Sequence, residues 1–261
     1  MKHSARAGRG LVRCLCVAAV AGGLALPSHA QTLKVLTAGA FKQIVLALAP
    51  TFEAGSELNV DVQNDTAGSL LKRVQAGETF DVLIATPTVL ASLAKEGLLD
   101  AATMHAVARV AIGVAVRTGD PLPPLETVDQ FKQAITGARK VAYIDPASGG
   151  SSGIYLTGLF SRLGIADEVR SKAVLVPGGL VADRVASGEA DLAIHQVSEI
   201  LPVKGVKLAG LLPDSIQNCT TYAAGAATAS RQPDAARAFV ALLTSPQAID
   251  TLRAKGMTPP P

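Results

Sequence analysis

The sequence predicts a two-lobed α/β protein in which each lobe is a mostly parallel sheet flanked by helices. Three observations predict this fold. Short apolar strands alternate with helices along most of the chain, which is typical of parallel sheets covered on both faces. Two long apolar stretches, 107–117 and 220–227, interrupt the alternation and suit strands that cross between two sheets. Segments 73–84 and 184–194 share a helix end, a glycine stop and a strand, as expected of two similarly built lobes.

The first half of the chain contains three strand–loop–helix units. Each begins with a short run of apolar residues, continues through small residues such as those at 37–40 and 64–69, and enters a segment with apolar residues at helical spacing. We expect strands at 33–36, 59–62 and 81–85, and helices at 41–52, 70–75 and 86–97.

The second half repeats the pattern after a proline-rich loop at 120–124. We expect a last helical region at 232–256, broken near Ser245, with one buried face. Lobe 1 is predicted to comprise 31–110 and 224–261, and lobe 2 to comprise 111–223. The other expected elements of this half are strands at 141–144, 174–176 and 192–194, and helices at 131–137, 152–164 and 180–187.

The stretch 143–156 is a strand, a loop of glycines and serines, and a helix start. Because side chains are nearly absent from the loop, its N–H groups can approach a ligand closely. The unpaired N–H groups of a helix N-terminus, with hydroxyls such as those of Ser148 and Ser151, suit an anion. A tight turn that needs glycine for its backbone angles explains the same residues.

Loops of this kind recur around Gly39, Gly68, Gly150 and Gly178. In open α/β sheets, the loops at the carboxyl ends of the strands form the ligand crevice. Because two of the four loops come from each lobe, the sequence predicts a cleft between the lobes that holds a small anion.

Residues 1–30 have the three parts of a secretory signal peptide: a basic start, a short apolar stretch at 17–26 and a small-x-small site at 28–30. The apolar stretch is too short to span a membrane, which takes about 20 apolar residues. We therefore expect export to the periplasm with cleavage after Ala30, and no stable membrane insertion.

Composition excludes several classes of function. Residues 1–30 hold four of the 24 Lys and Arg, which leaves 20 against 21 Asp and Glu and removes any case for nucleic acid. Cys219 is the only cysteine outside the signal, so no intramolecular disulfide and no thiolate metal site can form. The absence of Trp argues against stacked sugars. We expect a monomer without metal or cofactor.

Several short stretches together carry a resemblance to the periplasmic molybdate-binding protein family, which belongs to the type II solute-binding proteins of ABC importers. The resemblance covers nearly all of the chain after residue 30. It implies a periplasmic-binding-protein fold that closes over a desolvated oxyanion, with an importer permease as a partner. The stretches are Thr-Ala-Gly-Ala-Phe at 37–41, Asp-Thr-Ala-Gly-Ser-Leu at 65–70, Gly-Glu-Thr-Phe-Asp at 77–81, Ser-Gly-Ile-Tyr at 152–155 and Gly-Glu-Ala-Asp-Leu-Ala-Ile at 188–194.

The resemblance places the ligand contacts on residues of all four loops. Together with the loop argument, it makes His195 a candidate base if the protein is an enzyme. A histidine that only orients the ligand remains the alternative, as does a solvated role for Lys42 and a helix-capping role for Asp65. The predicted ligand-binding residues are Gly39, Ala40, Phe41, Lys42, Thr66, Ala67, Gly68, Ser148, Ser151, Ser152, Gly178, Gly179 and Gln196.

The chain departs from the family at two donors. Ala40 stands where the family has a hydroxyl, and His195-Gln196 where it has a tyrosine, and each unpaired group on a buried oxyanion costs about 1–3 kcal/mol. These departures favour a di- or tricarboxylate. The leading hypothesis is a binding protein for ABC-type uptake. The alternative is a member of the branch that resembles aconitate isomerases, with a 1,3-proton shift, and a weaker one is a molybdate or tungstate binder.

Overall fold

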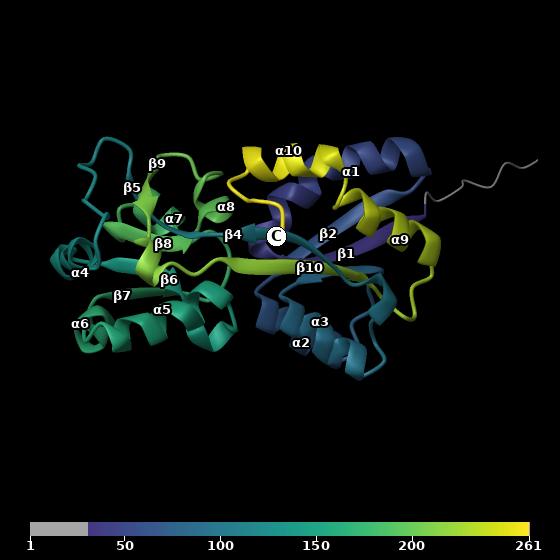
Figure 1. The fold of residues 1–261 in the computed structure, drawn as a ribbon, viewed down its shortest axis with the longest axis horizontal. Coiled ribbons are helices and arrows are strands. Elements are labelled where there is room, and N and C mark those ends of the chain that lie inside the picture. The colour runs from purple at the N-terminus through teal and green to yellow at the C-terminus, as the bar shows by residue number, and fades with distance from the viewer. Residues whose placement is uncertain (1–30, 261) are drawn as a thin grey trace, which may run out of the picture.

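The computed structural model describes residues 31–260 as two five-stranded sheets, each covered by helices (Figure 1). The predicted signal peptide 1–30 and its cleavage site lie outside the described residues. The α/β fold expected from the sequence is confirmed, with one refinement: both sheets are mixed. In each, four strands run in the same direction and one runs antiparallel to both of its neighbours.

The first sheet is built around β1 (Thr32–Ala38), which pairs in parallel with a neighbour on either side. The one antiparallel strand is β10 (Thr220–Ala226), which comes from near the end of the chain and pairs with a strand on either side. The order across the sheet is β2 (Asn59–Asp65), β1, β3 (Val82–Ala85), β10 (Thr220–Ala226) and β4 (His105–Val110).

The second sheet repeats this arrangement around β6 (Val141–Ile144). Its one antiparallel strand is β5 (Ile112–Arg117), which again lies between two strands that run the other way. The order is β7 (Ala173–Val176), β6, β8 (Leu192–Gln196), β5 (Ile112–Arg117) and β9 (Val206–Leu211). The similarity of segments 73–84 and 184–194 thus has a structural counterpart, because they lead into the equivalent strands β3 and β8.

Two connections join the sheets. The apolar stretch 107–117 is two strands, β4 and β5, which meet at Ala111, so each half lies in a different sheet. The return connection runs from β9 to β10 and contains the 3₁₀ turn η4 (Asp214–Ile216). The first predicted lobe boundary, 110/111, falls at a connection, whereas the second, 223/224, falls inside β10, all of which pairs in the first sheet.

The helices pack on both faces of their sheets. In the first lobe, buried residues of α1, α9 and α10 form one core and those of α2 and α3 form another on the opposite face (Figure 1). The expected break near Ser245 separates α9 from α10, where the Ser245 hydroxyl accepts the N–H of Ala248. The helices of this lobe are α1 (Lys42–Ser56), α2 (Ala67–Gln75), α3 (Pro87–Lys95), α9 (Pro233–Leu242) and α10 (Pro246–Ala254).

The second lobe has shorter helices. Its two cores again lie on opposite sides of the sheet. The helix expected at 180–187 is reduced to α7, four residues long. The helices are α4 (Val128–Gly137), α5 (Ser151–Arg162), α6 (Ala166–Ser171), α7 (Asp183–Ala186) and α8 (Val197–Ile200).

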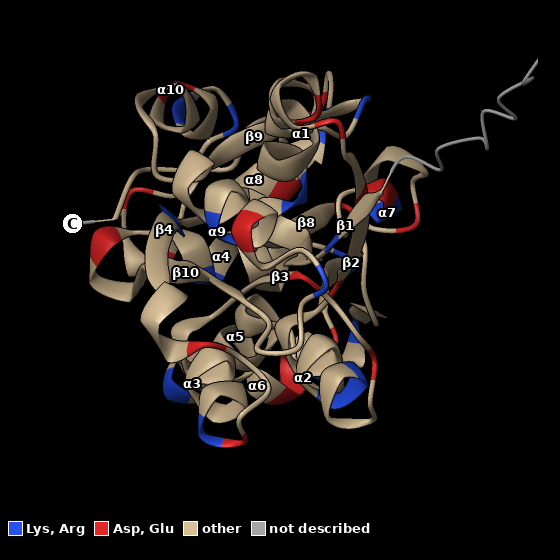
Figure 2. Ribbon diagram, turned by 90° about the vertical axis from the view of Figure 1, so that its right-hand side faces the viewer, with Lys and Arg blue, Asp and Glu red and all other residues tan. Residues whose placement is uncertain are grey.

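Charged residues are spread over the molecule. On the side shown in Figure 2, Lys and Arg are interspersed with Asp and Glu along helices such as α2 and α7. Within residues 31–260, no helix has the length and apolar character that crossing a membrane requires.

Candidate functional site

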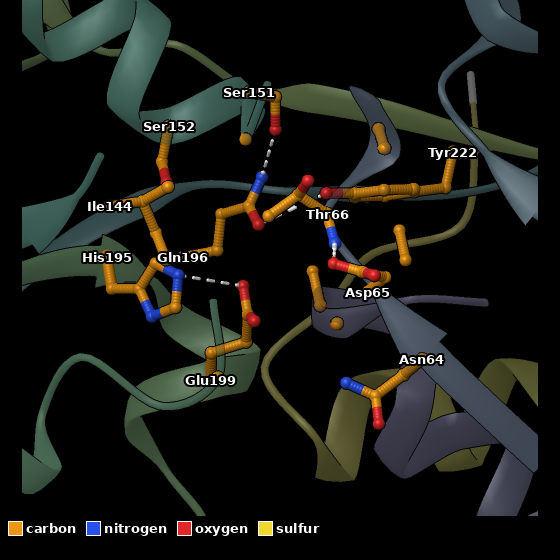
Figure 3. Close-up of a pocket in the computed structure, with 16 residues that line it drawn as sticks. Asn64, Asp65, Thr66, Ile144, Ser151, Ser152, His195, Gln196, Glu199 and Tyr222 are labelled. Atoms are coloured by element: carbon orange, nitrogen blue, oxygen red, sulfur yellow. Dashed lines mark hydrogen bonds and ion pairs between the residues drawn. The ribbon is translucent and has the colours of Figure 1, made fainter. Parts of the chain in front are cut away.

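A cavity of about 30 Å³ lies where the carboxyl ends of strands from both sheets face each other (Figure 3). The last residues of β1, β2, β6 and β8 all line it. A space of this size holds one or two water molecules. The lobes are therefore close together, and any larger ligand requires them to separate before it enters.

Most of the residues proposed from the sequence line this cavity. From the first lobe come the turn η1 (Gly39–Phe41) and the start of α2, and from the second come the start of α5 and the end of β8. The predicted residues that line it are Gly39, Ala40, Thr66, Ala67, Ser151, Ser152, Gly179, His195 and Gln196.

Other predicted residues lie nearby but do not line the cavity. Phe41 is fully buried in the core of the first lobe. Lys42, the first residue of α1, does not line the cavity, whereas Gly39 and Ala40 of the preceding turn η1 do. Gly178 precedes the lining residue Gly179. Gly68 and Ser148 take part in a contact between the lobes.

This contact joins the start of α2 to the loop before α5. The N–H of Gly68 donates to the carbonyl of Gly149 at 3.1 Å, and the Thr66 hydroxyl donates to the carbonyl of Ser148. A Cβ added at Gly68 would lie 2.7 Å from the Cα of Gly149, so a side chain there would push the lobes apart. The loops around Gly39, Gly68 and Gly150 thus gather at one place, as the crevice argument expected.

The helix starts at the cavity differ in their caps. Thr66 is the N-cap of α2, where its hydroxyl accepts the N–H of Ser69, so Thr66 rather than Asp65 has the capping role. Gly150 precedes α5 and has no side chain to cap it. The first-turn N–H groups of α5 therefore stay available to an anion.

His195 and Glu199 form a buried pair in the cavity wall (Figure 3). The Nε2 atom of His195 lies 3.1 Å from Oε2 of Glu199, and the two residues are only 1% and 6% exposed. Burial raises the pKa of Glu199 to about 8 and lowers the pKa of His195 to about 3, since both charged forms lose hydration. The pair is therefore neutral near pH 7, with a proton on the Glu199 carboxyl.

A second chain of hydrogen bonds crosses the cleft. The Tyr222 hydroxyl, from the first sheet, donates to Oε1 of Gln196 at 3.1 Å. Nε2 of Gln196 donates to Oγ of Ser151 at 3.0 Å. Burial raises the pKa of Tyr222, so its hydroxyl keeps its proton and remains a donor. Tyr222 thus places a phenol beside Gln196, although His195 and Gln196 stand where the molybdate-binding family has its tyrosine.

Sequence reasoning missed Glu199 and left Tyr222 without a role. Glu199 follows His195 by four residues, but the strand ends and α8 begins between them, so neither helical nor strand periodicity relates the two side chains. Tyr222 lies far along the chain in a strand that was expected only to cross between the lobes. His105 lines a different cavity, between β4 and α9, and Cys219 is exposed. Among residues 31–260, no group of three or more His, Cys, Asp and Glu could hold a metal ion.

Comparison with known proteins agrees with the motifs. Residues 33–258 match a family described as "Bacterial extracellular solute-binding protein". A protein of a Pseudomonas species named "Aconitate isomerase" is 32% identical over 236 residues, which cover 88% of each chain. The resemblance indicated by the sequence is thereby confirmed.

Solved structures agree at the level of the fold. The periplasmic molybdate-binding protein of Azotobacter vinelandii superimposes with a TM-score of 0.73 at 20% identity, over 88% of this chain and 100% of that one. A sulfate-binding protein of Mycobacterium tuberculosis gives 0.73 at 17% identity, over 88% and 87% of the two chains.

Proposed function

Because the chain belongs to the bacterial extracellular solute-binding protein family, we propose that it uses that fold as an isomerase that interconverts cis- and trans-aconitate. The observation that carries the proposal is the buried His195–Glu199 pair, which lies in the wall of the cavity between the lobes. A buried acid–base pair at that place can move a proton to or from a bound ligand. The similarity to a protein named aconitate isomerase supports the same conclusion.

The donors around the cavity suit carboxylates. Among the described residues that line it there is no Lys or Arg, so negative charge would be held by N–H groups and hydroxyls. The uncapped start of α5 and the hydroxyls of Ser151 and Ser152 supply such donors from the second lobe. A carboxylate can accept several of these hydrogen bonds at once.

The reaction is a 1,3-proton shift. A base removes a proton from the methylene carbon of aconitate, and the electron pair forms a new double bond conjugated to the carboxylates. The former double bond takes a proton at its far carbon, so one C–H bond breaks, one forms, and no atom is gained or lost. A positioned acid–base group typically contributes 10²- to 10⁴-fold to such a step. Closure over the allylic anion excludes water while the proton is in transit.

The proposal is tested by incubating the purified chain with trans-aconitate and following the cis isomer by proton NMR. We expect the two isomers to approach the same ratio from either side, and protein unfolded by heat to be inactive. If calorimetry shows that trans-aconitate binds tightly but no cis isomer forms, isomerisation is refuted.

The second candidate is a periplasmic binding protein that delivers a small carboxylate to an ABC importer. It is favoured by the contact between Gly68 and Gly149, which closes the lobes as solute capture requires. Export by cleavage after Ala30 is proposed for either function. Thermal shift with citrate, both aconitates, molybdate and sulfate separates the classes, since a ligand at 100 times its Kd stabilises by about 2.7 kcal/mol.

A further inference from the structure

The two members of the buried pair are not equally placed to touch a substrate. Nε2 of His195 faces Glu199, and Nδ1 is buried with no hydrogen-bond partner among the described residues. Because Nε2 is occupied by the Glu199 carboxyl and the residue is only 1% exposed, against 6% for Glu199, His195 is the less accessible of the two. The base proposed from the sequence therefore lies behind another group.

That group is the carboxyl of Glu199. One oxygen, Oε2, faces His195, whereas Oε1 extends toward the other lobe. A Cβ added at Gly39 would lie 2.6 Å from Oε1, so the carboxyl occupies the space that a side chain on η1 would fill. Figure 3 shows the Glu199 carboxyl between His195 and the residues of the first lobe.

The position of α8 explains why Glu199 reaches this place. Val197, at the start of α8, packs into the hydrophobic core of the first lobe although β8 belongs to the second sheet. Glu199 is therefore held at the contact between the lobes. When the lobes close, the Glu199 carboxyl is brought into contact with a ligand in the cleft.

We propose that Glu199 is the catalytic residue that takes the proton from the substrate and returns it, and that His195 is a positioning residue that holds the Glu199 carboxyl in place. This inference rests on the proposed isomerase function. Oε1 of the carboxylate accepts the methylene proton, the double bond shifts, and the resulting carboxylic acid gives the proton to the far carbon. A single carboxyl thereby serves as base and then as acid on one face of the substrate.

Burial supports this role. A carboxyl with a pKa of about 8 is a stronger base than an exposed one, yet its carboxylate form is accessible near neutral pH. The other titratable groups that line the cavity are His195 on β8, Tyr222 on β10 and Asp65 on β2. The kcat of isomerisation should therefore rise as pH approaches 8.

The test compares four variants, one of them a control, for kcat, KM and trans-aconitate Kd. We expect Glu199→Gln to lower kcat by at least 10²-fold with a Kd within a few-fold of the unsubstituted protein. Gly39→Ala should lower kcat because its Cβ displaces Oε1, whereas Gly55→Ala, where a Cβ meets nothing within 4 Å, is the matched control. His195→Gln should keep measurable turnover and shift the pH at which kcat is half-maximal.

A label experiment needs no variant. With substrate deuterated at the methylene carbon, a single carboxyl shielded from water should return part of the deuterium to the far carbon of the same molecule. Complete loss of label to solvent, or Glu199→Gln turning over within tenfold of the unsubstituted protein, overturns the inference while leaving the isomerase intact. If the unsubstituted protein does not isomerise aconitate, the proposed function fails and this inference fails with it.

Discussion

Glu199→Gln should change how stability depends on pH, independently of any catalytic role. The pKa of Glu199 is raised by burial from 4.5 to about 8, so between these values the folded protein keeps a proton that the unfolded chain has lost. The stabilisation is complete below pH 4.5 and is lost as pH rises through 8. His195 acts in the opposite direction between pH 3 and 6.5, because its pKa is lowered from 6.5 to about 3.

The two effects cancel between about pH 4.5 and 6.5, so the net loss falls between pH 6.5 and 8. Between these values the free energy of unfolding falls by up to about 1.4 kcal/mol per pH unit. The total fall is about 1.5 kcal/mol, because Glu199 is already partly ionised in the folded protein near pH 8. For a chain of this size, that lowers Tm by roughly 3–6 °C.

Thermal melts of the two proteins at pH 6.5 and 8 measure the difference. Glu199→Gln, which cannot ionise, should lose this fall in Tm. Glu78→Gln is the matched control, because Arg73 lowers the pKa of Glu78 to about 2 and the exchange cannot alter the slope above pH 6.5. If Glu199→Gln melts show the same fall as the unsubstituted protein, Glu199 is not held protonated and the account of the pair is incorrect.

Three further changes test the cleft. Gly68→Ala should increase the radius of gyration in small-angle scattering, because its Cβ would meet the Cα of Gly149 at 2.7 Å. An unchanged radius would show that the closed lobes accommodate the added methyl group. Tyr222→Phe removes the hydroxyl that donates to Gln196 and should weaken trans-aconitate binding about fivefold, or about 1 kcal/mol, by calorimetry; equal affinity would mean that this bond does not support closure. Lys42→Ala should leave the affinity within twofold, since Lys42 does not line the cavity, and a tenfold loss would restore it as a ligand contact.

The local units of the fold could be predicted because their signals are local. The small residues before α1, α2 and α5 and the apolar runs of β1 and β6 mark strand ends and helix starts within a few residues. The mixed character of the sheets could not be predicted. It arises because β5 and β10 pair with strands that lie far from them in the sequence.

The candidate site could likewise be predicted only in part. Gly39, Thr66 and Ser152 follow from loop composition, since a backbone that approaches a ligand closely requires small residues there. Glu199 was missed because its carboxyl occupies a space that exists only because residue 39, in the other lobe, is a glycine. Only the closed tertiary structure brings these two residues together.

The two connections between the lobes are tied to each other by one side chain. Oε1 of Gln217, in the β9–β10 connection, accepts the N–H of Ile112 at 2.9 Å, and its Nε2 donates to the carbonyl of Ile112 at 3.0 Å. A shear of one connection past the other would break both hydrogen bonds, whereas a swing about the Gln217 amide preserves them. This tie therefore favours opening of the cleft by rotation over opening by shear.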